Sequence, residues 1–181
     1  MTGVQTCALP IFAQFKVWED DLKKFKLKTH TPSAGERILV DNLSFDVLWP
    51  SRGKLAEFQA LAPKDLNESS IVLRMNTSLG FCGYFTGDIP IEIFNSVVDR
   101  RCGLLKVGHH GSKTGTNAQI IEKVAPEVAL IEVGKNNRYG HPNKEVIDLL
   151  ILKGTHIYRT DTDGSVQIVI EGGKWKAFKR S

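Results

Sequence analysis

Short apolar runs alternate with polar stretches along most of this chain, most regularly in its second half. Brief apolar runs bounded by glycine or turn residues are typical of strands, and apolar residues three or four positions apart are typical of helices. The pattern predicts strands over 35–40, 43–49, 71–75, 79–85, 104–107, 128–133, 156–159, 166–170 and 175–178. It predicts helices within 12–27 and over 90–98, 117–124 and 144–152. Residues 51–70 are expected to be mostly loop, with a helical turn around 55–61.

The order of these elements indicates the fold class. Strands pair as hairpins in the first and last parts, whereas strands alternate with helices in between. This order predicts a mixed-sheet α/β domain built of layers. No internal repeat and no low-complexity tract interrupts it.

Bulk composition is that of an ordinary globular domain. The chain has 181 residues, 41% hydrophobic and 24% charged, with a net charge of +4. That charge is compatible with a polyanionic partner but too small to argue for one. No apolar run is long enough to span a membrane, and no stretch has the basic start and apolar core expected of a signal peptide. Cys7, Cys82 and Cys102 have no zinc-like spacing, and Cys82 and Cys102 are expected to be buried free thiols.

Residues 1–11 stand apart from this pattern. The stretch MTGVQTCALPI fits no helix or strand period, and it looks like the translation of a common sequencing-library adapter. We therefore expect 1–11 to be an artefact and 12–181 to be a partial domain, the carboxyl-terminal piece of a longer protein.

The most informative stretch follows the strand predicted over 104–107. Its sequence, Gly108-His109-His110-Gly111, places two imidazoles between glycines that let the backbone turn sharply. In open α/β sheets, ligands bind at the carboxyl ends of strands. Imidazoles at such an end are suited to metal ligation or proton transfer.

Two further predicted strands end in the same way. Gly87-Asp88 follows the strand ending at 85, and a loop ending at His141 follows the strand ending at 133. If these strands share one polarity, Asp88, the His109–His110 pair and His141 meet at one sheet edge. A carboxylate among imidazoles suits one or two divalent ions, which would lower the pKa of a bound water. Separately, Asp88 could cap the next helix, and His141-Pro142 could be a simple turn.

Two other interpretations of the histidine loop have less support in the sequence. A phosphate-binding P-loop requires a glycine directly before its lysine, but Ser112 precedes Lys113. A serine hydrolase would need a Gly-x-Ser-x-Gly elbow, which is absent around Ser112.

Taken together, these motifs resemble one known family. The segments that carry the resemblance are FTGD (85–88), LKVGHHGSK (105–113), GKNNRYGHP (134–142) and YRTDTDG (158–164), and 43–50 resembles a hairpin that precedes them. They are similar to the carboxyl-terminal metallo-β-lactamase-like domain of ComEC-type DNA internalisation (competence) proteins. The resemblance covers nearly everything from Phe12 onward and implies the C-terminal portion of an αββα sandwich.

The resemblance also implies roles for individual residues. Asp88 would bridge metals, and His141 would be the last metal-ligand histidine. His109 and His110 would line the site as a metal ligand or proton donor, and which of the two is the ligand stays open. Ser112 and Lys113 would face a substrate phosphate.

The implied parent protein is a bacterial membrane channel that imports single-stranded DNA. Its soluble domain would be a hydrolase with two divalent ions, zinc or manganese, acting as a nuclease on the strand that is not imported. The implied partners are DNA, the membrane channel portion of the same protein and other competence proteins.

One departure limits the resemblance. The His-x-His-x-Asp-His cluster that supplies most ligands in this superfamily is missing, since His30 is the only histidine before His109. A truncation would explain the loss, and a degenerate metal-free paralogue is the competing explanation. We therefore expect the chain to bind metal weakly or not at all, to be inactive and to be poorly stable. A hydrolase of small esters or phosphates and a non-catalytic DNA-binding module remain as alternatives.

Overall fold

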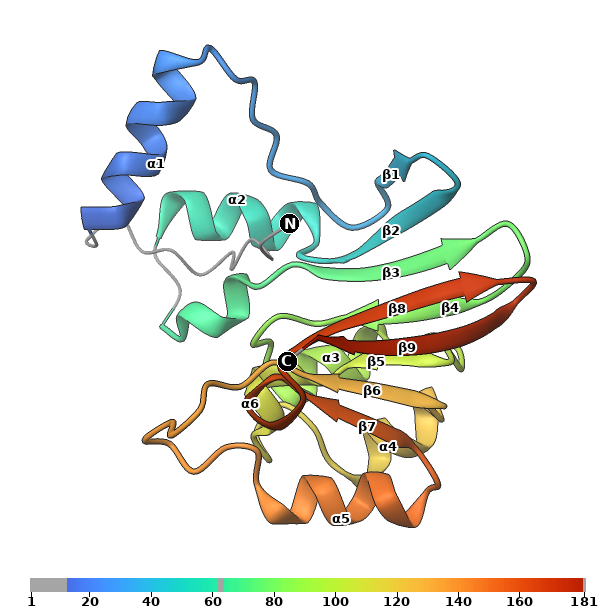
Figure 1. Cartoon of the computed structure of the whole chain (residues 1–181). Helices are drawn as coiled ribbons and strands as arrows, with labels where there is room; N and C mark the ends of the chain where they lie inside the picture. The colour runs from blue at the N-terminus through green and yellow to red at the C-terminus, as the bar shows by residue number, and fades with distance from the viewer. Residues whose placement is uncertain (1–12, 62–63, 181) are drawn as a thin grey trace.

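The seven strands of the main sheet lie side by side in the same order as they occur along the chain (Figure 1). The computed structural model describes residues 13–61 and 64–180, so the expected adapter segment 1–11 lies outside the described residues. The sheet consists of β1 (Arg37–Val40), β2 (Leu43–Trp49), β3 (Val72–Thr77), β4 (Cys82–Phe85), β5 (Leu104–Lys106), β6 (Val128–Ile131) and β7 (His156–Arg159). Neighbouring strands are antiparallel from β1 to β4 and parallel from β4 to β7.

In the part of the chain that the structure describes, the remaining elements are six α-helices, two short 3-10 helices, η1 (Leu66–Ser69) and η2 (Gly108–Gly111), and a separate hairpin. The α-helices are α1 (Ala13–Lys24), α2 (Arg52–Ala60), α3 (Ile91–Val97), α4 (Ala118–Val124), α5 (Lys144–Leu152) and α6 (Thr160–Asp163). The hairpin pairs β8 (Ser165–Glu171) with β9 (Lys174–Arg180) in a second, two-stranded sheet. Within 13–61 and 64–180, no helix is both long and apolar enough to cross a membrane.

The two faces of the sheet are covered differently because side chains alternate along each strand. Tyr84, Leu105 and Ala129 pack into a core completed by α3, α4 and α5. On the opposite face, Leu104 and Val128 pack in a second cluster with apolar residues of the β8–β9 hairpin, which crosses this face in Figure 1. The mixed α/β class is confirmed, and the layers of helix, sheet and second sheet are those expected for part of an αββα sandwich. The expected poor stability stays a prediction.

Most predicted elements lie within a few residues of the observed ones, but the stretch 51–70 differs. It was expected to be mostly loop, yet α2 spans nine residues of it. Ser51 caps this helix, its Oγ accepting a hydrogen bond from Lys54 N at 3.2 Å. None of the α2 residues is buried, so the helix has no apolar stripe that a periodicity analysis could detect.

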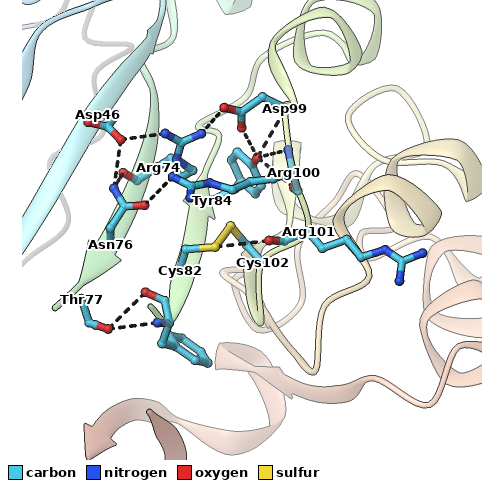
Figure 2. Close-up of a disulfide and its surroundings, with 11 residues drawn as sticks. Asp46, Arg74, Asn76, Thr77, Cys82, Tyr84, Asp99, Arg100, Arg101 and Cys102 are labelled. Carbon is cyan, nitrogen blue, oxygen red and sulfur yellow. Dashed lines mark hydrogen bonds and ion pairs between the residues drawn. A yellow bond between two sulfur atoms is a disulfide. The ribbon is translucent and has the colours of Figure 1, made fainter. Parts of the chain in front are cut away.

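The expectation of free thiols at Cys82 and Cys102 is wrong, because the structure joins them in a disulfide (Figure 2). Cys82 begins β4 and Cys102 precedes β5, so the bond ties two neighbouring parallel strands where both start. Their Cα atoms are 4.9 Å apart, within the usual range for such a bond. Strand pairing brought the cysteines together, which their separation of 20 residues did not reveal.

An ionic network centred on the buried Arg74 lies beside the disulfide (Figure 2). Arg74 on β3 donates from Nη2 to Asp46 Oδ2 at 2.7 Å and from Nη1 to Asp99. Asn76 also donates to Asp46, and the Tyr84 hydroxyl donates to Asp99 at 2.8 Å. The network thus joins β2, β3 and β4 to the segment that follows α3.

Candidate functional site

The parallel order of β4, β5 and β6 places their three carboxyl ends at one edge of the sheet. Asp88 follows β4, His109 and His110 follow β5, and His141 lies in the loop that follows β6. The shared strand polarity assumed from the sequence is therefore confirmed. The side chains expected at one edge do come together there.

The turn after β5 holds both histidines in an unusual backbone conformation. His109 and His110 have φ values of 48° and 55°, in the left-handed region that residues other than glycine rarely adopt. Such strain persists only where the surroundings fix it, and it concentrates at functional sites. His109 N donates to Gly87 O at 3.2 Å, which ties this turn to the end of β4 beside Asp88.

The ring of His110 is oriented by a backbone carbonyl and faces Asp88. Its Nδ1 donates to Glu132 O at 2.7 Å, and its Nε2 lies 3.5 Å from Asp88 Oδ2. The hydrogen bond with His110 holds the pKa of Asp88 below its ordinary value, and Asp88 in turn raises the pKa of His110. Because the Glu132 carbonyl engages Nδ1, Nε2 is the ring nitrogen that is left to bind a ligand. Metal-ligating histidines commonly have such a partner on their other ring nitrogen.

His109 and His141 face each other across the two loops. Their ring centroids are 5.9 Å apart, and the His109 centroid is 6.3 Å from that of His110. Burial, and then the nearby charges of the other two histidines, lower the pKa of His141. The Nδ1 of His141 is buried and hydrogen-bonds to no atom of the described residues. A buried nitrogen without a partner, with its lone pair available, suits a metal ligand.

Close packing of the two loops brings these histidines together. Gly111 has a φ of 82°, and a Cβ built there would lie 2.5 Å from the Cβ of Pro142. Only glycine therefore permits the loop after β5 to approach the His141 loop this closely. Asn143 fastens the contact, since its N donates to Gly111 O and its Oδ1 accepts from Lys113 N, each at 2.9 Å.

The two residues expected to face a phosphate differ in exposure. Ser112 is buried, and its Oγ is hydrogen-bonded to Thr114 Oγ1 at 2.9 Å, whereas Lys113 is exposed to solvent. Lys113 is thus free to approach a ligand, and Ser112 stabilises the turn that carries Lys113. The role of each in substrate binding stays a prediction.

Three polar residues of the site were not singled out from the sequence. Thr114 Oγ1 lies 3.4 Å from His109 Nδ1. Asn137 brackets the backbone of His141, accepting from its N at 2.9 Å and donating to its O at 2.6 Å. The third is Asn143, at the start of α5. Asparagine's preference for turns and helix starts is the only signal that could have indicated Asn137 and Asn143.

The donor types fit a divalent cation, but their number does not complete a site. A carboxylate and imidazole nitrogens are suitable ligands for zinc or manganese. Among the described residues, however, no three His, Cys, Asp or Glu side chains are placed to hold a metal ion together. The edge therefore provides part of a ligand set.

Comparison with known proteins identifies relatives of this chain. No protein-family model matches the chain. It is 37% identical over 137 residues to "ComE operon protein 3" of Bacillus subtilis, a match that covers 74% of this chain and 16% of that protein. It is 32% identical over 149 residues to "Competence protein ComA" of Neisseria gonorrhoeae, covering 80% of this chain and 20% of that protein.

Solved structures are also similar to this chain. One of them is a putative zinc-dependent hydrolase of the metallo-β-lactamase superfamily from Thermotoga maritima, with a TM-score of 0.44 and 12% identity. The match covers 73% of this chain and 72% of that one. Among the sequence relatives, the chain spans a fifth or less of each protein's length. The resemblance to competence proteins is confirmed as homology to part of these proteins.

Proposed function

We propose that this chain, which is homologous to part of bacterial competence proteins, supplies one side of the active site of a metal-dependent hydrolase that cleaves DNA phosphodiester bonds. The observation that carries the proposal is the meeting of Asp88, His110 and His141 at the carboxyl edge of parallel strands. The rest of the ligand set would come from another part of a longer protein.

Each residue at this edge would have a distinct task. Asp88 and His141 would each supply a ligand to divalent cations whose sites the rest of a longer protein completes, with the oriented Nε2 of His110 beside Asp88 as a further donor. His109 would carry a proton, and the exposed Lys113 would attract the phosphate as a point charge. A bound cation would supply Lewis-acid activation of water and would neutralise charge on the phosphodiester.

The biological setting is part of the same proposal. The longer protein would lie in the bacterial cell membrane, and this domain would act on the DNA strand that is not imported. Its partners would be DNA, the channel portion of the same protein and other competence proteins. Homology to proteins named for competence supports this setting.

Calorimetric titration with zinc and manganese tests the proposal. We expect weak binding by the whole chain, and Asp88→Asn should reduce the affinity by roughly tenfold or more. Asp148→Asn is the matched control, because Asp148 is an exposed α5 residue paired with Lys144. Circular dichroism would establish that both variants are folded. Undetectable binding by the parent chain, or equal binding by parent and Asp88→Asn, would overturn the proposal.

A further inference from the structure

The β8–β9 hairpin has an inner and an outer face that are chemically different. Trp175 packs with Ile168 and Ile170 against the main sheet. Because side chains alternate along a strand, the other set on β9 points away from the sheet. We call this set the outward stripe; it consists of Lys174, Lys176, Phe178 and Arg180.

The outward stripe is positively charged and carries an exposed aromatic ring. Lys174, Lys176 and Arg180 contribute three cations, and the acid on the same face of β8 is Glu171, 3.7 Å from Lys176 Nζ. Neither Lys174 nor Arg180 forms an ion pair with any residue that the structure describes. Phe178 lies between Lys176 and Arg180, with 49% of its surface exposed. An apolar ring left in water between cations suits a partner that offers both anions and flat apolar faces.

The spacing and direction of the outward stripe further limit the kinds of partner that it can bind. Alternate residues of a strand are about 6.7 Å apart, so the cations follow a line rather than a cluster. Arg180 is paired with Ser165, which follows α6 and the carboxyl end of β7. The stripe therefore runs towards the sheet edge that carries Asp88 and the histidines. In Figure 1 the end of β9 lies beside α6 at that edge.

We propose that the outward stripe binds single-stranded nucleic acid. The three cations contact successive phosphates, and Phe178 stacks on an unpaired base. Stacking on an aromatic residue within a basic track is the general mode of single-strand binding, and it requires bases that are not paired in a duplex. The inference deepens the proposed function, on which it rests for the direction of the bound strand, but the binding itself needs no metal.

Fluorescence anisotropy with a labelled oligothymidylate tests the whole chain in EDTA over a range of salt concentrations. We expect Lys174→Gln/Lys176→Gln/Arg180→Gln to bind at least tenfold more weakly. Its plot of log affinity against log salt should be flatter by about 2, since each lost phosphate contact removes roughly 0.7. Phe178→Leu should weaken binding about fivefold with an unchanged salt slope.

A matched control separates local from overall charge. Lys16→Gln/Lys23→Gln/Lys24→Gln removes the same charge from α1, where all three lysines are exposed, and should bind like the parent. Equal loss in both triple variants would overturn the inference, as would unchanged binding in the stripe variants. Tighter binding of duplex than of oligothymidylate would also overturn it, and so would competition by phosphatidylglycerol vesicles that depends on Phe178. Because the assay contains EDTA, its failure is distinct from failure of the metal site.

Discussion

At the scale of single residues, the Arg74 network shows how a charged group is tolerated inside this domain. The hydrogen bond from Arg37 and those from Arg74 and Asn76 lower the pKa of Asp46 to about 2, against an ordinary value of 3.8. A carboxylate whose pKa is lower in the folded chain stabilises the fold fully above its unfolded pKa, and this contribution is lost as the pH falls. The loss is therefore expected between about pH 4 and pH 2.

We predict that Asp46→Asn reduces the acid sensitivity of the domain. Urea unfolding at pH 7 and pH 3 should show the parent losing more stability than the variant, by about 1 kcal/mol. The pKa of Glu36 is also lowered to about 2, so the difference between parent and variant isolates Asp46. Parallel acid profiles for the two proteins would contradict this assignment.

At the scale of elements, the Cys82–Cys102 bond fixes how β4 and β5 begin together. The two cysteines are 20 residues apart, so the bond restricts a loop that includes α3 in the unfolded chain. Loop-closure entropy for such a length corresponds to about 3 kcal/mol. Loss of the bond should therefore weaken the pairing on which the candidate site depends.

We predict that Cys82→Ala/Cys102→Ala lowers the free energy of unfolding by about 3 kcal/mol. A Cys7→Ser background leaves this pair as the only thiols, and mass spectrometry would verify the bond in the parent. Reduction with dithiothreitol should lower the urea midpoint of the parent but not that of the double variant. A reagent effect of equal size in both would mean that the bond contributes nothing.

At the scale of the whole molecule, sequence patterns predicted most of the strands and, on the condition that three of them share one polarity, the meeting of Asp88 with the histidines. This was possible because one pattern occurs three times: a short apolar strand is followed by a glycine and then by a residue that can bind a metal. The polarity itself and the order of the strands in the sheet came from the structure. The sequence patterns missed α2, which buries no side chain, and the disulfide, which depends on pairing between distant segments. They also missed the asparagine contacts at Asn137 and Asn143, because only the folded loops bring these partners within reach.

The central claim is that Asp88 and His141 act as metal ligands at the sheet edge, with His110 beside Asp88 as a further donor. The most direct measurement is the ring ¹⁵N spectrum of the histidines during zinc titration of the whole chain. We predict that His110 Nε2 and His141 Nδ1 shift together, whereas His30 and His156, elsewhere in the fold, do not. Unmoved resonances for His110 and His141, or equal shifts in all five histidines, would contradict the account.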